Sequence, residues 1–178
     1  MKLVVIYGPP AVGKMTTAER LGVITKYLVF HSHLAIDLVS SITPEDSGKV
    51  YSDFLFRIIY ETIEFACKNG QQGLIMTIAY TGSEKQKKLL KRLKALVERD
   101  GGNICPVKLF ASMDELKKRV VNSSRDYYGK LMSAEELEVW MSETDYLSKM
   151  DISESLEIDN TGISPEAVAE SIKSYYHL

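Results

Sequence analysis

The fold of this chain is decided by one short stretch, Gly8-Pro9-Pro10-Ala11-Val12-Gly13-Lys14-Met15-Thr16. An apolar run over Leu3–Tyr7 comes directly before it and predicts a strand, and a helical pattern opens after it. Gly8 and Gly13 allow backbone conformations that turn several amide N–H groups toward one point. A helix that begins near Gly13 adds the positive end of its dipole, and Lys14 adds a cation. The stretch therefore predicts an anion-binding loop between a strand and a helix.

The spacing of Gly8, Gly13 and Lys14 is that of the P-loop motif, which holds the phosphates of a nucleoside triphosphate. An ordinary glycine turn is the alternative, but the spacing and the place between strand and helix both favour the motif. We expect Lys14 to lie against the β- and γ-phosphates. The residues predicted to contact the nucleotide here are Gly8, Pro9, Pro10, Ala11, Val12, Gly13, Lys14, Met15 and Thr16.

The residue after the lysine departs from the motif. The motif has Ser or Thr there, whose hydroxyl ligates Mg²⁺, whereas this chain has Met15, which is no ligand for a hard cation. Thr16 follows, but successive helical residues are rotated by about 100° from each other. Thr16 is therefore better placed to bond an α-phosphate oxygen than to replace the missing ligand. Metal binding is predicted to be weakened or relocated, with Thr16 and Asp37 as the candidate protein contacts.

Short β-rich runs alternate with helical patterns along the rest of the chain. Further strands are predicted over Tyr27–Phe30, Leu74–Ile78, Cys105–Phe110 and Leu156–Asp159, and helices over 51–68 and 84–99. The apolar face of the first helix is predicted to consist of Phe54, Leu55, Ile58, Ile59, Thr62 and Phe65. Helix starts are marked by capping boxes at Ser83, Ser112 and Ser133 and by Ser164-Pro165. This alternation predicts an α/β fold in which helices cover both faces of a parallel sheet. Because no linker or repeat interrupts the chain, we expect one domain over residues 1–178.

Composition narrows the class of protein. The chain has 178 residues and a formal net charge of −2, which gives no general attraction to nucleic acid or to anionic membranes. No apolar run is long enough to span a bilayer, and the N-terminus does not resemble a signal peptide, so we expect a cytoplasmic protein. Cys67 and Cys105 stand far apart and are expected to be buried thiols.

A cluster of cations could indicate a nucleic-acid site: Lys85, Lys87, Lys88, Lys91, Arg92 and Lys94. Leucines rather than aromatic residues interleave with it, so no platform for stacking bases is present in the pattern. The cluster is predicted to be the solvated face of a helix.

The chain resembles the small P-loop kinases, the group that includes shikimate kinase, chloramphenicol phosphotransferase and the nucleoside monophosphate kinases. The resemblance covers nearly the whole chain. It rests on residues 8–16, His31-Ser32-His33 with Asp37, the region from Arg119 to Arg125, and Ile158-Asp159-Asn160-Thr161 with Ser164-Pro165-Glu166. It implies a three-layer fold with a five-stranded sheet ordered 2-3-1-4-5, and a mobile lid with arginines at about residues 119–132.

In such kinases an acidic residue past the second strand holds the acceptor hydroxyl or supports Mg²⁺, and Asp37 matches that place. A carboxylate can orient the hydroxyl and accept its proton. The alternative is a surface or capping aspartate on a short helix. His31 and His33 are expected to alternate on one strand edge. His33 is predicted either to line the acceptor pocket or to be a half-buried histidine with a hydrogen-bond partner, and Arg57 is a further candidate acceptor contact.

Cations of the predicted lid would close over the nucleotide. Arg125 would offset charge on the transferred phosphoryl group, Arg119 would contact the nucleotide and Lys130 the acceptor. The alternative for all three is a solvated helix end. The resemblance also implies that Asn160 or Thr161 touches the adenine, although both could simply satisfy a turn.

These patterns predict an enzyme that moves the γ-phosphate of ATP to a hydroxyl of a small molecule, which the sequence does not identify. The partners would be ATP, Mg²⁺ and that acceptor, with no nucleic acid or membrane, in a monomer or homodimer. The alternative is a nucleotide-binding protein with weak or no kinase activity, because of Met15 and because no acidic residue follows the third strand at Ala79-Tyr80-Thr81-Gly82. A regulatory GTPase is disfavoured, since no Asn/Thr-Lys-x-Asp motif is present.

Overall fold

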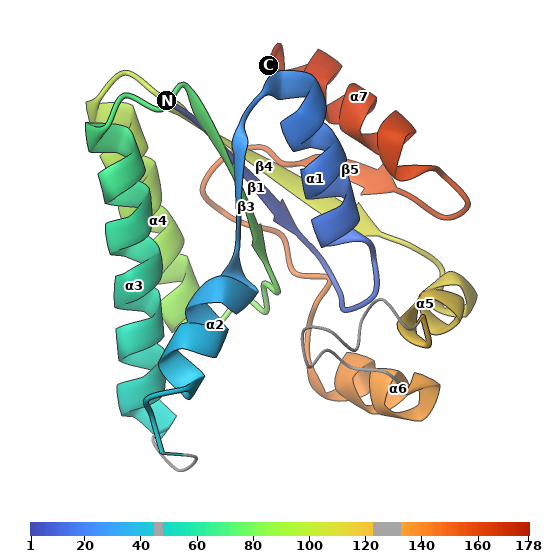
Figure 1. The fold of residues 1–178 in the computed structure, drawn as a ribbon. Coiled ribbons are helices and arrows are strands. Elements are labelled where there is room, and N and C mark those ends of the chain that lie inside the picture. The colour runs from blue at the N-terminus through green and yellow to red at the C-terminus, as the bar shows by residue number, and fades with distance from the viewer. Residues whose placement is uncertain (45–47, 123–132) are drawn as a thin grey trace.

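A computed structural model describes residues 1–44, 48–122 and 133–178. Its strands are β1 (Lys2–Tyr7), β2 (Leu28–His31), β3 (Gly73–Ile78), β4 (Asn103–Phe110) and β5 (Leu156–Asp159). They form one sheet in the order β2-β3-β1-β4-β5, and every neighbouring pair is parallel (Figure 1). The predicted fold class and strand order are confirmed.

Helices cover both faces of this sheet. They are α1 (Lys14–Thr25), α2 (Ser32–Ser40), α3 (Gly48–Lys68), α4 (Glu84–Arg99), α5 (Met113–Val120), α6 (Ala134–Glu143) and α7 (Pro165–Tyr176). Helices α3 and α4 pack on one face, and α1 and α7 on the other (Figure 1). Helices α5 and α6 lie below the sheet and contribute to the α1 and α7 side of the core. None of the described helices combines the length and apolar character that crossing a membrane requires.

The burial of the central strand β1 determines where the loop after it lies. Leu3, Val5 and Tyr7 enter the core beneath α3 and α4, whereas Val4 and Ile6 enter the core beneath α1 and α7. All five are fully buried, as expected for a parallel strand covered on both faces. The chain therefore leaves β1 at the middle of the carboxyl edge of the sheet, where ligands of open α/β sheets bind.

The predicted helix starts are confirmed at four places. The hydroxyls of Ser83, Ser112, Ser133 and Ser164 accept backbone N–H bonds at the first turns of α4, α5, α6 and α7. Each bond satisfies one amide that the helix itself leaves without a partner. The serine at each of these four positions therefore predicted the start of a helix correctly.

Two predictions made from the apolar pattern are wrong. His31 ends β2 and α2 begins at Ser32, so His31 and His33 do not alternate on one strand edge. The backbone passes directly from an extended His31 into the helix. In α3 the buried residues are Ile59 and Ile63, whereas Phe65, assigned to the apolar face, is 69% exposed.

Both cysteines are free thiols, and they differ in burial. Cys105 is buried in β4 as predicted, and burial raises its pKa to about 11. Cys67 is only partly buried, so its prediction is half correct.

The segment 144–155, which joins α6 to β5, is held by side chains from the core. Buried Lys108 donates through Nζ to the carbonyl of Leu147. The hydroxyl of Tyr7 accepts from the amide of Met150 and bonds Ser155 Oγ. These contacts fasten a stretch without regular secondary structure to the strands.

Candidate functional site

The loop between β1 and α1 takes a conformation that few residues adopt. Gly8, Ala11 and Gly13 have positive φ angles of 142°, 61° and 96°. A Cβ atom at Gly8 would lie 2.1 Å from the carbonyl oxygen of Leu109, so only glycine fits there. Ala11 accepts the left-handed conformation at a cost of about 1 kcal/mol. The conformation of the loop is thus set by backbone requirements at these three positions.

The first turn of α1 has no side-chain cap. Gly13 is the N-cap residue, it offers no capping atom, and no acidic residue occupies the first turn. The first intrahelical bond runs from the amide of Thr17 to the carbonyl of Gly13 at 3.0 Å. The amides of the first turn and the helix dipole are therefore directed at whatever lies in front of the loop, which favours an anion.

The side chain of Lys14 folds back over this loop. Its Nζ atom donates to the carbonyl oxygens of Gly8 at 2.8 Å and Pro9 at 2.7 Å. The ammonium group therefore lies against the loop, close to the amides that the turn gathers. Backbone donors and a cation converge here, as binding of a phosphate requires.

A buried network ties the loop to two other elements. Asn160, 3% exposed, donates through Nδ2 to the carbonyl of Val12 at 2.7 Å. Arg119 of α5 donates to the same carbonyl at 3.1 Å and to the carbonyl of Asn160 at 2.9 Å. Its Nε atom bonds Glu115 at 2.8 Å. Arg119 and Asn160 thus position the loop, whatever contact they make with a ligand.

A cavity of about 160 Å³ opens beside this network. It brings together Thr16, Arg119 and Asn160, three of the residues predicted to contact a nucleotide. Its remaining lining residues are Gly13, Thr17, Ile163 and Pro165. The prediction missed the last three of these, although an apolar Ile163 directly before a helix cap was a usable signal.

Thr161 takes a different place from Asn160. Its hydroxyl donates to Asp159 Oδ1 at 2.6 Å and accepts from the amide of Ser112 at 2.9 Å. The bonds from Thr161 lower the pKa of the Asp159 carboxyl. Thr161 thus stabilises the turn after β5, and it is not among the residues that line the cavity.

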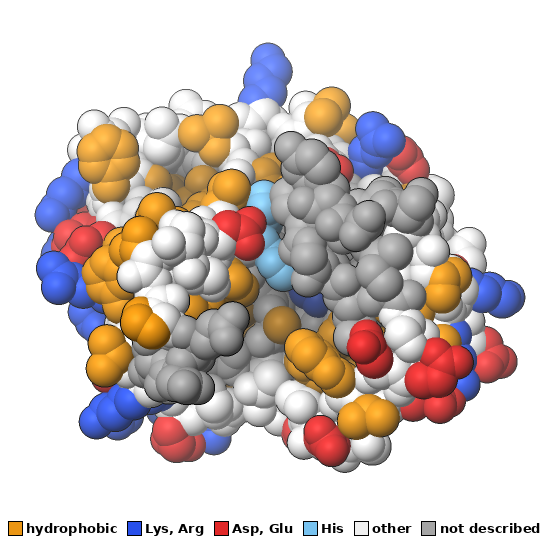
Figure 2. All heavy atoms as spheres, turned by 60° about the horizontal axis from the view of Figure 1, so that its bottom comes forward, with side chains coloured by type: hydrophobic (Ala, Val, Ile, Leu, Met, Phe, Trp, Pro, Cys, Tyr) orange, Lys and Arg blue, Asp and Glu red, His pale blue; other side chains and the backbone are white. Residues whose placement is uncertain are grey.

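The acceptor candidates lie on α2. Asp37 is exposed on that helix, the short-helix placement that was its alternative. The rings of His31 and His33 lie 6.4 Å apart, and His31 is buried at the end of β2. Figure 2 looks at the carboxyl edge of the sheet and shows histidine side chains beside a hollow, next to an acidic side chain.

Arg57, a further predicted acceptor contact, does not lie at this site. Arg57 lies on α3, pairs with Glu61 at 2.8 Å and lines a separate groove between α3 and α4. Arg125 and Lys130 fall outside the described residues, as does most of the predicted lid. Within the described residues, no group of three or more His, Cys, Asp or Glu side chains could hold a metal ion.

Sheet order, loop geometry and the position of Lys14 together define the fold of the small P-loop kinases. No protein-family model matches the chain, and no curated protein does. Among solved structures, the chain is similar to the tunicamycin resistance protein of Deinococcus radiodurans, with 19% identity and a TM-score of 0.65 over 99% of this chain and 96% of that one.

Two kinases give the same result. A sugar kinase from Janibacter sp. HTCC2649 is 16% identical, with a TM-score of 0.67 over 99% of this chain and 95% of that one. Shikimate kinase from Acinetobacter baumannii is 14% identical, with a TM-score of 0.60 over 99% and 92%. These likenesses show the fold.

Proposed function

We propose that the protein transfers the γ-phosphate of ATP to a hydroxyl of a small molecule. The observation that carries this proposal is the start of α1, where an uncapped helix and the ammonium of Lys14 converge on one loop. Similar folds include a sugar kinase and shikimate kinase, whose acceptors are hydroxylated small molecules. An acceptor of that class is therefore proposed for this chain.

Several of the predicted residues receive a task in this proposal. The triphosphate lies on the amides of residues 8–16, with Lys14 against the β- and γ-phosphates. The nucleoside end occupies the cavity lined by Thr16, Arg119 and Asn160. Asp37 orients the acceptor hydroxyl and accepts its proton. Arg125, in the proposed lid over 119–132 of a single domain, offsets charge on the phosphoryl group.

The described residues do not fit a Mg²⁺ site built by the protein. Met15 stands where a ligating hydroxyl is usual, and Thr16 lines the cavity instead. We propose that Mg²⁺ is bound by phosphate oxygens and water, with Asp37 as the proposed carboxylate contact. No step above depends on the metal.

The test is a screen for transfer of labelled phosphate from ATP to hydroxylated metabolites, sugars, antibiotics and nucleotides. For the acceptor that scores, Lys14→Ala should lower kcat by a factor on the order of 10³, since it removes the cation at the reacting phosphates. Lys118→Ala, an exposed lysine of α5, is the matched control and should leave the rate unchanged. Transfer that persists in Lys14→Ala would remove Lys14 from this role.

A second function is favoured by one observation. Met15, partly buried at the start of α1, supports a protein that binds nucleotide without efficient transfer. The substitution Met15→Ser separates the two functions, because serine supplies the missing hydroxyl. A gain in Mg²⁺-dependent turnover of about tenfold or more would favour the non-catalytic alternative. Little change in a protein that is already active would show that the metal is held elsewhere.

A further inference from the structure

The basic cluster of α4 divides into two sets of side chains. Seven of the 16 residues of this helix are Lys or Arg and two are Glu, in a protein with a net charge of −2. One set contacts acceptors within the fold: Lys87 pairs with Glu84, Lys91 with Asp151, and Lys94 bonds the carbonyl of Ile152. The other set, Lys85, Lys88 and Arg92, lines a groove shared with α3. The cluster, which was predicted to be a solvated helix face, thus includes three cations that line a groove.

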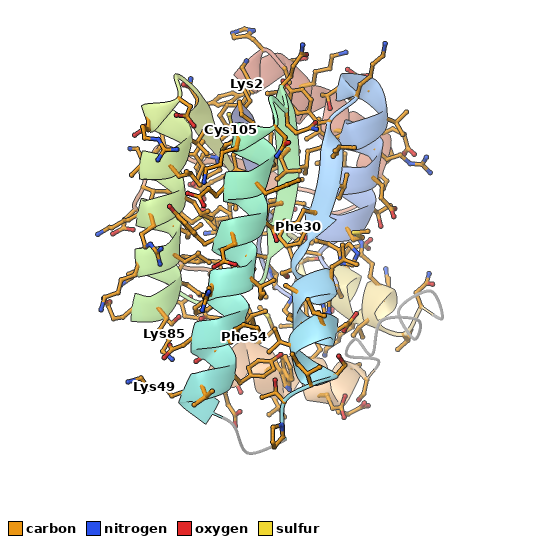
Figure 3. All side chains as sticks on the ribbon, turned by 60° about the vertical axis from the view of Figure 1, so that its left-hand side comes forward. Lys2, Phe30, Lys49, Phe54, Lys85 and Cys105 are labelled. Atoms are coloured by element: carbon orange, nitrogen blue, oxygen red, sulfur yellow. The ribbon has the colours of Figure 1, made fainter. Side chains whose placement is uncertain are left out.

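This groove, about 280 Å³ in volume, combines apolar surface with excess positive charge. Figure 3 looks onto α3 and α4, which run side by side, and labels Lys85 in the lower part of α4. Partly buried Phe56 supplies the accessible apolar surface, with Leu89 almost fully buried behind it, and Asp53 is the one carboxylate in the lining.

Of the cations in the groove, Lys85 is paired with Asp53 and Arg57 with Glu61. Lys88 has no hydrogen bond or ion pair among the described residues, and Arg92 lies 4.2 Å from the ring centre of Tyr60 with no carboxylate partner in that part of the chain. Like charges four residues apart on a helix destabilise it slightly, and here no acid compensates them. The groove therefore presents two cations to solvent beside an apolar surface.

Helix α6 carries the complementary pattern. Glu136, Val139, Trp140 and Glu143 follow the i, i+3, i+4, i+7 spacing of one helix face, and all four are exposed. Val139 is 50% exposed and Trp140 48%, and α6 contains no Lys or Arg. Tryptophan is enriched among the residues that contribute most to binding in interfaces, so exposed Trp140 is suited to the centre of one.

The two features lie at opposite sides of the molecule in Figure 1, so one molecule cannot bring its own together. We propose that α6 of one copy docks in the groove between α3 and α4 of a second copy. Trp140 would pack on Phe56, while Glu136 and Glu143 face the groove cations. The two acids lie seven residues apart, about 10.5 Å along a helix, and can therefore flank Lys88 and Arg92, which lie four residues or about 6 Å apart.

Such a contact joins two different surfaces, so it does not close on itself as a symmetric dimer does. Sedimentation of the whole protein should show assembly that grows with concentration, with a Kd on the order of 100 µM for this small interface. Raising the salt from about 0.05 M to about 0.5 M should weaken the assembly at least fivefold, because the charges are exposed.

Charge reversal gives a sharper test. The double variants K88E/R92E and E136K/E143K should each be monomeric, because groove and helix then carry the same sign. An equimolar mixture of the two should assemble again, since each groove meets a helix of opposite charge. Trp140→Ala should weaken assembly at least tenfold, whereas the exposed control Lys118→Glu should not. Circular dichroism confirms that every variant is folded.

A wild-type protein that stays monomeric up to about 1 mM would overturn the proposal, as this is ten times the expected Kd. A mixture that fails to assemble would overturn it as well. If the wild type is monomeric but binds an acidic peptide or an oligonucleotide, and K88E/R92E does not, the groove serves a different partner and self-association is rejected. These readouts do not involve phosphoryl transfer, so they stand apart from the proposed function.

Discussion

Helices α1 and α7 begin side by side at the same edge of the sheet, but their first turns are built differently. Helix α7 starts with a serine cap, a proline at its first position and an acidic Glu166 in the first turn. Helix α1 starts at a glycine with no cap, and its first residue is a lysine. The start of α7 satisfies its own amides and dipole, whereas the start of α1 leaves them available to an anion. The first turn of α7 therefore stabilises the fold, whereas the first turn of α1 is suited to binding an anion.

The largest effect should come from giving α1 an acid like that of α7. A side chain at Gly13 meets only ordinary contacts, with Asn160 Nδ2 at 3.7 Å and Arg119 Nη1 at 3.8 Å from its Cβ. Gly13→Asp should weaken ATP binding on the order of 100-fold relative to Gly13→Asn, because it places a negative charge beside the phosphates. Asparagine has the same size and tolerates a positive φ, so it controls for backbone strain.

Isothermal titration calorimetry measures the affinity of each of the two Gly13 variants for ATP. Equal affinities would mean that no phosphate lies at the start of α1.

Removing the side chain of Asn160, which joins the loop before α1 to the turn before α7, should have the next largest effect. Asn160→Ala deletes the buried bond to the carbonyl of Val12, leaving Arg119 as its donor. Unfolding free energy should fall by about 1.5 kcal/mol, the net value of one buried hydrogen bond, because Arg119 still satisfies the carbonyl of Val12. Nucleotide affinity should fall as well, because the loop is less firmly held. Urea unfolding and calorimetry check this, and Asn69→Ala on the surface of the chain serves as control.

The cap of α7 should affect stability alone. Ser164→Ala should lower the unfolding free energy by about 1 kcal/mol, because the amide of Ala167 loses its side-chain acceptor. ATP affinity should stay at the wild-type value. A drop in affinity would show that the two helix starts are not separate in function, and the contrast drawn above would fail.

The smallest effect concerns the turn before α7. Thr161 bonds lower the pKa of Asp159, so this carboxylate stabilises the fold above its usual pKa, and the contribution is lost as the pH falls through the lowered value. Thr161→Val removes the hydroxyl donor, so the pKa of Asp159 should rise toward about 3.9. Titration by NMR between pH 2 and 6 follows it. An unchanged pKa would mean that the backbone amide alone sets it.

Features that depend on neighbouring residues were the ones that could be predicted well from the sequence. The serine caps, the glycine loop and the apolar strands each depend on a few neighbouring residues, and the structure confirms them. The prediction failed at His33, since nothing local marks the point where β2 passes into α2 without a turn. Phe65 was assigned to the apolar face by helical period alone, which does not show whether another element covers that position, and its side chain is exposed.

Long-range contacts could not be predicted. The buried Lys108 reaches a carbonyl 39 residues away, and Arg119 reaches Val12 across 107 residues. Neither pairing has a signature in spacing or composition, because only the folded sheet brings the groups together. The role of Arg119 in holding the loop therefore became visible only in three dimensions, whereas the roles given to Asp37, Arg125 and Lys130 remain predictions.

The bonds from Lys14 to Gly8 and Pro9 have a consequence for ligand affinity. A free lysine side chain gives up about 2 kcal/mol of rotamer entropy when it is fixed. Here much of that freedom is already lost before any ligand arrives, because the bonds to the two carbonyls hold the ammonium at the loop. An incoming anion therefore immobilises little more of this side chain, and its affinity gains by the entropy that the fold has already given up.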